Sequence, residues 1–342
     1  MKNRITDLKI EDLRAELVKW GEPEFHAAQI FSWIYQKGVY DFSRMTNLSA
    51  SLRSKLDESF LVRSLKLKEA QNSIDGTQKL LLELEGRNFI EAVIIPAEGR
   101  VTGCVSSQVG CKFGCSFCAS GVLGFKRNLS AGEIIEEVLY LRDNALEKKI
   151  THIVFMGTGE PLDNYENVLK SVRILNCKEG LNIGARRITI STCGLIPGMK
   201  RLADEGLQIE LSISLHAADD KTRSILVPVN KKYPLRELID ACHDYIKKTG
   251  RQITFEYVLI AGLNCDLQSA RKLSILLKGL NCKVNLISSN PIKELKVEPP
   301  GKLEILFFRD YLVKNKINVT LRKARGQDID AACGQLRLRY AQ

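Results

Sequence analysis

The segment Gly110-Cys111-Lys112-Phe113-Gly114-Cys115-Ser116-Phe117-Cys118 carries three cysteines in the spacing C-x3-C-x2-C. Its two glycines allow a tight loop, in which three sulfur atoms can converge on one small inorganic core. Thiolates are the natural ligands of iron–sulfur clusters. Because only three are supplied, one iron of a four-iron cluster stays open to chelate the amino and carboxylate groups of a substrate. We therefore predict a [4Fe–4S] cluster on Cys111, Cys115 and Cys118.

Two other interpretations of these cysteines explain the pattern less well. Buried core cysteines would be expected among apolar neighbours, whereas glycine, lysine and serine surround these. A zinc site usually shows paired C-x2-C units and a fourth ligand. No histidine lies nearby in the sequence to complete such a site.

Helices and strands alternate after the cysteine segment. Ser130 and Glu133 form a capping box that predicts the start of a helix running to Leu141. Repeated strand–helix units favour an α/β fold, with a parallel sheet and helices outside it. About six units fit a partial barrel better than a closed eightfold one. The expected strands cover 150–156, 187–191, 209–215, 253–260 and 283–288, and further helices cover 165–175, 235–247 and 267–280.

The first hundred residues change their pattern once. Leu13, Leu17 and Trp20 recur at helical spacing, whereas Leu80, Leu82 and neighbouring residues alternate as in a strand. Asp75-Gly76 is typical of a hairpin turn. We expect an N-terminal helical accessory domain over 1–62, a β-hairpin extension over 63–100, and a barrel with a C-terminal segment over 101–342.

The overall composition favours a cytoplasmic protein with an anionic partner. The chain has 342 residues and a net charge of +11, which favours nucleic acid, although a solvated lysine-rich surface would give the same excess. No apolar run approaches the roughly 20 residues of a membrane helix, and the N-terminus lacks the apolar core of a signal peptide. Cytoplasmic cysteines are expected to be reduced, so their spacing indicates metal binding or catalysis.

The cysteine spacing, with Phe117 just before the last cysteine, resembles the radical S-adenosylmethionine superfamily, whose fold is a partial (β/α)6 barrel. Further segments are similar to one family within it, the RlmN adenine C2 methyltransferases of ribosomal and transfer RNA. Thr158 stands where that family would lead us to expect methionine. The matching segments are Cys104–Cys111, Met156–Leu162, Ser191-Thr192-Cys193-Gly194, Ser212–Ala217, Val284–Ile287 with Asn290-Pro291, and Asp328–Leu336.

This resemblance implies methylation of carbon 2 in adenine 2503 of 23S ribosomal RNA and in adenine 37 of transfer RNA. It implies two molecules of S-adenosylmethionine, one of which first methylates Cys333. The second is cleaved reductively to a radical that takes a hydrogen atom from this methyl group, and the resulting methylene radical adds to adenine. Cys104 then attacks Cys333 to form a transient disulfide, and Glu91 matches the general base.

The resemblance also implies a set of residues that bind S-adenosylmethionine. Each implied residue has a plainer interpretation: Cys104 as a core residue, Glu91 as a solvated strand position, and His216 as a core histidine. Cys177, Cys193, Cys242, Cys265 and Cys282 show no ligand spacing and are interpreted as structural. The implied cofactor residues are Gly159, Glu160, Ser191, Ser214, Leu215, His216 and Asn290.

Two other functions stay open at this point. One is the related methylation of carbon 8 of adenine. Pro161-Leu162 and the basic stretch 322–326 argue against it, because both resemble the carbon 2 family. The other is a non-enzymatic iron–sulfur protein that binds RNA. The expected partners are 23S ribosomal RNA, transfer RNA and an electron donor such as flavodoxin. We expect the protein to be a monomer with no membrane association. The basic groups Lys126-Arg127, Lys231-Lys232 and Arg322-Lys323 with Arg325 could contact phosphates.

Overall fold

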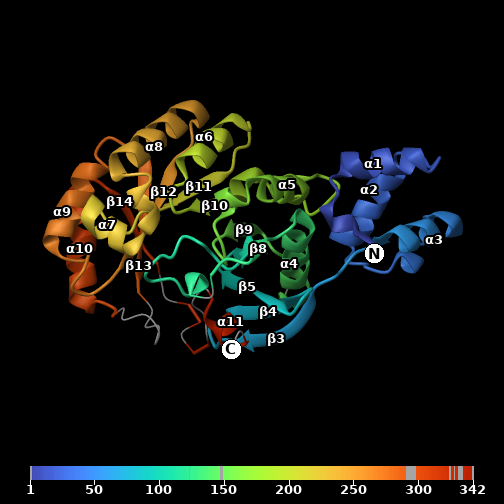
Figure 1. Cartoon of the computed structure of the whole chain (residues 1–342), viewed down its shortest axis with the longest axis horizontal. Coiled ribbons are helices and arrows are strands. Elements are labelled where there is room, and N and C mark those ends of the chain that lie inside the picture. The colour runs from blue at the N-terminus through green and yellow to red at the C-terminus, as the bar shows by residue number, and fades with distance from the viewer. Residues whose placement is uncertain are drawn as a thin grey trace.

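In the part of the chain that the structure describes, ten strands form one continuous sheet that crosses most of the molecule (Figure 1), in the order β14-β13-β12-β11-β10-β9-β6-β5-β4-β3. The computed structural model describes residues 2–122, 124–146, 149–289, 298–322, 325–326, 328–329 and 334–340. Seven neighbouring strands of the sheet run parallel, and three antiparallel strands continue it at one edge.

The parallel strands and the helices between them form the α/β fold of repeated strand–helix units that the sequence predicts. Each crossover places a helix on the outer side of the sheet, as Figure 1 shows for α6, α8, α9 and α10. One parallel strand more than expected, β14, follows the sixth. The strands are β6 (Arg100–Cys104), β9 (His152–Phe155), β10 (Ile188–Thr192), β11 (Glu210–Ser214), β12 (Ile253–Leu259), β13 (Cys282–Ser288) and β14 (Asn318–Leu321). The helices are α4 (Ala131–Asn144), α5 (Tyr165–Asn176), α6 (Ile196–Asp204), α7 (Asp220–Leu226), α8 (Leu235–Thr249), α9 (Leu267–Leu276) and α10 (Lys302–Lys314).

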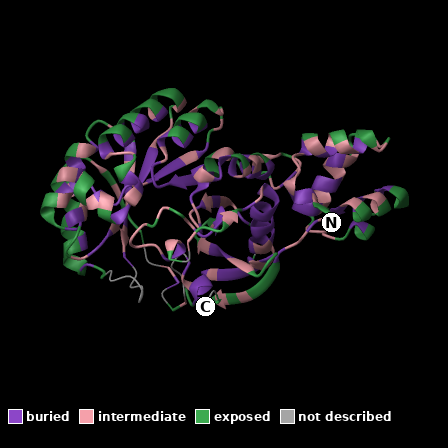
Figure 2. Ribbon diagram, in the orientation of Figure 1, coloured by how far each residue is buried: buried purple, intermediate pink, exposed green. Residues whose placement is uncertain are grey.

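Burial explains why these strands form where they do. Phe255 and Tyr257 on β12 are fully buried, since one face of the strand packs against helices and the other lines the barrel interior. Figure 2 shows buried strands surrounded by helices whose outer faces are exposed. The predicted capping box is confirmed, because the Ser130 hydroxyl accepts from the Glu133 backbone N–H and the Glu133 carboxylate accepts from the Ser130 N–H.

The antiparallel strands β3 (Lys66–Asn72), β4 (Gln78–Leu84) and β5 (Asn88–Ala97) extend the barrel sheet at β6. The predicted turn at Asp75-Gly76 is present, and Gly76 has a φ of 81°, a conformation that favours glycine. The short helix α11 (Gln335–Tyr340) packs against β5. The end of the chain therefore lies against the strand that leads into the barrel.

The N-terminal segment is helical, as expected. Leu13 and Leu17 are buried, and Ser49 caps the third helix by accepting from the Leu52 N–H. Among the helices of the described residues, none combines the length and apolarity needed to cross a bilayer. The segment contains β1 (Asn3–Arg4), α1 (Ile10–Lys19), α2 (His26–Phe31), a π-helical stretch (Ser32–Gln36), α3 (Ala50–Ser59) and β2 (Phe60–Leu61).

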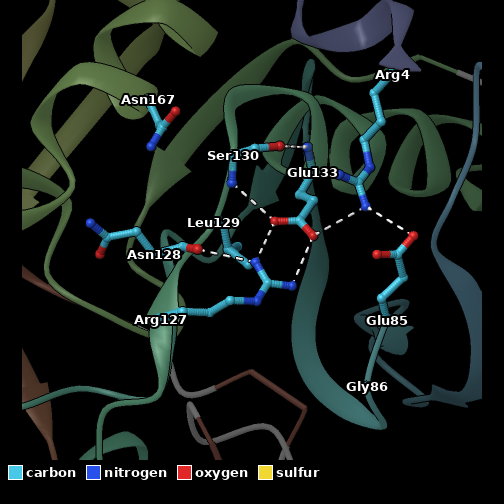
Figure 3. Close-up of a pocket in the computed structure, with 9 residues that line it drawn as sticks. All are labelled: Arg4, Glu85, Gly86, Arg127, Asn128, Leu129, Ser130, Glu133 and Asn167. Carbon is cyan, nitrogen blue, oxygen red and sulfur yellow. Dashed lines mark hydrogen bonds and ion pairs between the residues drawn. The ribbon is translucent and has the colours of Figure 1, made fainter. Parts of the chain in front are cut away.

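Charged groups join this segment to the barrel around an open pocket of about 550 Å³ (Figure 3). Arg4 lies 3.6 Å from Glu133 and 3.8 Å from Glu85, and Arg127 makes two hydrogen bonds to Glu133. Asp7 accepts from a backbone N–H in the first turn of α4. Because these charges pair with one another, we interpret the pocket as a structural junction between the N-terminal helices and α4.

Candidate active site

A second cavity, of about 360 Å³, lies at the carboxyl ends of the parallel strands. Ligands of α/β barrels gather at this end, because the loops that follow the strands meet there. Of the predicted site residues, the cavity brings together Cys104, Cys111, Cys115, Cys118, Gly159, Glu160, Ser191, Ser214 and His216. Leu215 is buried directly beside this wall. Asn290 and Cys333 lie outside the described residues.

The cysteine loop is closed by a glycine that permits a very close backbone approach. Gly110 has a φ of 84°, and a Cβ there would lie 1.7 Å from the carbonyl oxygen of Gly124. The strands β7 (Gln108–Val109) and β8 (Arg127–Asn128), which precede and follow the cysteine loop, pair with each other. Within the loop, the Cys118 N–H donates to the Cys115 carbonyl at 3.1 Å. The cysteines are therefore confined to one turn at the cavity wall.

The thiols in this loop fit an iron–sulfur cluster. Burial raises the pKa of Cys111 to about 12 and raises the pKa of Cys115 further, so their ionised forms need a nearby positive charge. Bound iron supplies that charge and deprotonates coordinating thiols. In the described part of the chain, no three His, Cys, Asp or Glu residues are grouped to hold a single metal ion. A four-iron cluster differs from a mononuclear site because each thiolate binds a different iron.

Glu160 provides a buried carboxylate beside the cluster loop. One of its oxygens accepts from the Cys193 N–H at 2.8 Å, and the other accepts from the Leu162 N–H at 3.1 Å. Burial raises the pKa of Glu160, and these donors oppose that rise. At Gly159 a Cβ would lie 2.6 Å from the Cβ of Gln108, so only glycine fits here. Since a carboxylate has about four acceptor positions, Glu160 can also accept from an ammonium group in the cavity.

His216 is a wall residue with a defined tautomer. Its Nδ1 accepts from the Val258 N–H at 3.0 Å, which leaves the proton of the neutral ring on Nε2. Burial, with a smaller effect of Arg223, lowers the pKa of His216 to about 3. The ring packs edge-on against Phe117, with 4.5 Å between ring centres. The neutral imidazole therefore links the cluster loop to the strand ends.

Arg223 is a residue that the sequence did not single out. It is fully buried on α7 and donates to the carbonyl oxygens of Cys193, Ser214 and Leu215 and to the Asn230 side chain. These contacts fix the ends of β10 and β11 relative to each other. One arginine in a short helix gives no sequence signal of this role, because such residues are usually exposed.

Two further wall residues were not predicted as site residues. Glu256 on β12 accepts from Asn285 at 3.0 Å through one oxygen, while its other oxygen has no hydrogen-bond partner among the described residues. Burial raises the pKa of Glu256. Cys193, which we interpreted as structural, lines the cavity next to Glu160. Neither residue belongs to a spacing pattern that could have identified it.

Cys104 and Glu91 lie on neighbouring strands with different surroundings. Cys104 is the last residue of β6, pairs with Val93 of β5, and lines the cavity. Glu91 is only 3% exposed, so its interpretation as a solvated strand position is wrong. Its carboxylate accepts from the Lys79 ammonium and from the N–H groups of Gly334 and Arg337.

Comparison with known proteins matches two family models to this chain. The model described as the Radical SAM superfamily covers residues 105–270. The model described as the ribosomal RNA large subunit methyltransferase N-terminal domain covers residues 4–62. The two matches together span the N-terminal helices and the cluster-bearing barrel.

Whole-chain relatives agree with these matches. A protein of Clostridium perfringens described as "Probable dual-specificity RNA methyltransferase RlmN" is 47% identical, and the alignment covers 99% of this chain and 98% of the relative. A relative in Thermotoga neapolitana with the same description is 48% identical over the same shares. The crystal structure of a radical SAM methyltransferase from Sphaerobacter thermophilus is 44% identical and superposes with a TM-score of 0.94, covering 97% of this chain and 98% of that one.

Proposed function

Because the chain belongs to the RlmN family of radical S-adenosylmethionine RNA methyltransferases, we propose that it methylates carbon 2 of adenine in 23S ribosomal RNA and in transfer RNA. The proposed targets are adenine 2503 and adenine 37, respectively. Membership of the family establishes an RNA methyltransferase whose cofactors are a [4Fe–4S] cluster and S-adenosylmethionine. The observation that supports the proposal best is the single cavity that contains the cluster cysteines, the Glu160 carboxylate and Cys104.

The proposed cofactor residues have distinct tasks. Cys111, Cys115 and Cys118 would hold the cluster, and Glu160 with Gly159 would bind the amino group of S-adenosylmethionine. Together the bound cofactors supply the carbon-centred radical chemistry. The adenosyl part is assigned to the strand ends through Ser191, Ser214, Leu215 and His216, and to Asn290, which lies outside the described residues.

The chemistry of the target atom explains the need for two further cysteines. Carbon 2 of adenine is electrophilic and has no nucleophilic lone pair, so it cannot displace a methyl group from a sulfonium. Cys333 would accept the methyl group on its thiolate and, after loss of one hydrogen atom, would form a carbon–carbon bond to the ring. Glu91 would take the proton from carbon 2, and the unpaired electron that the addition leaves on the ring would pass to the bound cluster. The Cys104 thiolate would then attack the sulfur of Cys333, forming a disulfide and breaking the bond between that sulfur and the new methyl carbon, which would keep the bonding electron pair and take up a proton to become the methyl group.

RNA would reach this cavity along a positively charged edge. Arg322 and Arg325 line the cavity, and the whole chain carries a net charge of +11. Phosphate contacts of this kind orient a nucleic acid without reading its sequence. A target adenine would have to leave its stack to enter the cavity. The proposal includes a monomeric enzyme acting in the cytoplasm with an electron donor such as flavodoxin.

Mass spectrometry of nucleosides tests the proposal. The protein would be reconstituted anaerobically with iron and sulfide, then incubated with S-adenosylmethionine, a reductant and either unmodified 23S ribosomal RNA or transfer RNA. We expect 2-methyladenosine from both substrates. Appearance of 8-methyladenosine would assign the chain to carbon 8 chemistry, and no methylated adenosine from a cluster-loaded protein would refute both.

A matched pair of variants tests the role of Cys333. Cys333→Ala should keep the visible absorbance of the cluster and lose all product. Cys282→Ala changes a buried cysteine that does not line the cavity, and this variant should retain both the cluster absorbance and the methylated product. Product formation by Cys333→Ala at the rate of the unmodified protein would contradict the proposal that Cys333 carries the methyl group.

A further inference from the structure

Glu91 and Lys79 form a buried charged pair on the strands that precede the barrel. Their side chains are 3% and 0% exposed, and the Lys79 Nζ donates to the Glu91 Oε2 at 2.8 Å. Glu91 lies opposite Leu81 and Lys79 lies opposite Val93, so the two side chains are diagonal neighbours on one face of β4 and β5. Burying such a pair is costly unless further hydrogen bonds satisfy the charges.

The additional hydrogen bonds come from the C-terminal segment. The Glu91 Oε2 accepts from the Gly334 N–H at 2.8 Å, and its Oε1 accepts from the Arg337 N–H at 2.7 Å. Both donors belong to the start of α11, where backbone N–H groups have no partner inside the helix. Glu91 thus joins Lys79 of β4 to a segment that follows it by more than 240 residues.

Gly334 is also packed against the cluster loop. Its φ is 84°, and a Cβ there would lie 2.7 Å from the Ser120 nitrogen and 2.9 Å from the Ala119 carbonyl carbon. Ala119 and Ser120 directly follow the cluster ligand Cys118 in the chain. Gly334 is therefore held between the Glu91 carboxylate and the loop that carries the cluster.

We infer that Glu91, supported by Lys79, is a positioning residue for Cys333. Gly334 directly follows Cys333 in the sequence, so contacts that fix Gly334 act on the residue bonded to Cys333. This inference rests on the proposed function, in which Cys333 carries the methyl group. It adds Lys79 to the residues that the reaction requires, although Lys79 does not touch the reacting atoms.

The contacts of Glu91 are compatible with two tasks. In this structure its two oxygens accept three N–H groups, out of about four positions that a carboxylate offers. The remaining position can take the proton from carbon 2. A Lys79 variant therefore disturbs the positioning contacts without removing the base.

Hydrogen exchange of the cluster-loaded full-length protein tests the inference. Lys79→Met removes the ammonium but keeps a side chain of similar length. We expect backbone amides of the peptide covering 334–340 to exchange about tenfold faster or more, the scale of a lost charge-assisted hydrogen bond. Lys19→Met is the control, since Lys19 pairs with Glu16 on the surface and is 71% exposed. It should leave the exchange of this peptide unchanged.

Methylation of Cys333 provides the second measurement. The protein would be incubated with S-adenosylmethionine without RNA, and the methyl group on Cys333 would be quantified by peptide mass spectrometry. Lys79→Met should slow this step about tenfold. A residue that acts only as the general base would not be needed before RNA binds. Exchange and methylation at the rates of the unmodified protein would overturn the inference.

A second variant covers the case in which Lys79→Met does not fold. Gly334→Ala leaves the charged pair intact and introduces a Cβ where no space exists, so it should also accelerate exchange in 334–340. Unchanged exchange in Gly334→Ala would overturn the inference. If the unmodified protein never methylates Cys333, the proposed function fails, whereas the exchange experiment still decides whether Glu91 and Lys79 fix the C-terminal segment.

Discussion

Replacement of Arg223 should destabilise the fold and loosen the cofactor site together. The guanidinium lies 2.7 Å from the Cys193 carbonyl oxygen, 3.2 Å from those of Ser214 and Leu215, and 2.9 Å from the Asn230 Oδ1. Arg223 itself is fully buried. Arg223→Met fills much of the same space but provides no donor, so four buried oxygens lose this partner at once.

The size of the effect follows from opposing contributions to the free energy of unfolding. Each buried acceptor that loses its donor costs about 1–3 kcal/mol. Four such losses would exceed any typical single mutation, but methionine avoids the several kcal/mol needed to bury a guanidinium. We expect a net loss of about 3–5 kcal/mol, at the high end for a point mutation. Arg223→Lys should recover little, because an ammonium cannot present the planar set of donors that these oxygens require.

Urea unfolding followed by circular dichroism measures the loss of stability, and equilibrium binding of S-adenosylmethionine reports on the strand ends. Affinity should fall at least about tenfold, since Cys193 orients Glu160 and the 214–216 segment forms the adjoining wall. The control is Arg173→Met, which removes an arginine 2.8 Å from Glu205 at the surface and should change neither quantity. An Arg223→Met protein that unfolds at the urea concentration of the unmodified chain would refute this account of the buried guanidinium.

Three further outcomes follow from the structure. Burial raises the pKa of Glu137 well above its ordinary value. The folded chain therefore holds a proton on this carboxyl group to a higher pH than the unfolded chain does, so stability falls as pH rises above the unfolded pKa of about 4.3. Glu137→Gln should raise stability at pH 7 and flatten this dependence in urea unfolding at several pH values; an unaltered pH profile would contradict it. Arg325→Ala should weaken RNA binding and reduce the slope of log affinity against log salt by about 1 in filter-binding titrations, and an identical slope would exclude a phosphate contact. Gly110→Ala should prevent iron loading, measured as iron bound per chain, because its Cβ would lie 1.7 Å from the Gly124 carbonyl oxygen; normal loading would contradict the required close approach.

The local parts of the fold could be predicted from the sequence. The strand expected over 253–260 is observed at Ile253–Leu259, where large apolar side chains stand at every second position, from Ile253 to Leu259. We did not predict β14 (Asn318–Leu321), whose residues are mostly exposed and give no such pattern. Pairing of β5 with β6 was also beyond prediction, since alternation shows that a strand has two faces but not which strand will be its neighbour.

In the candidate site, too, residues that lie close together in the sequence could be predicted, whereas residues with distant partners could not. The grouping of Cys111, Cys115 and Cys118 at one cavity could be predicted, because the C-x3-C-x2-C spacing places all three within eight residues of sequence. Glu91 could be matched to a family but not understood, because its partners Lys79 and Gly334 lie on another strand and near the other end of the chain. Arg223 had no signal, since its partners are mostly backbone carbonyls, which every residue possesses. Sequence spacing thus identifies groups that bind a cofactor through one short loop. Groups that hold distant segments in place become visible only when the chain has folded, as Glu91 does for Gly334 and as Arg223 does for the ends of β10 and β11.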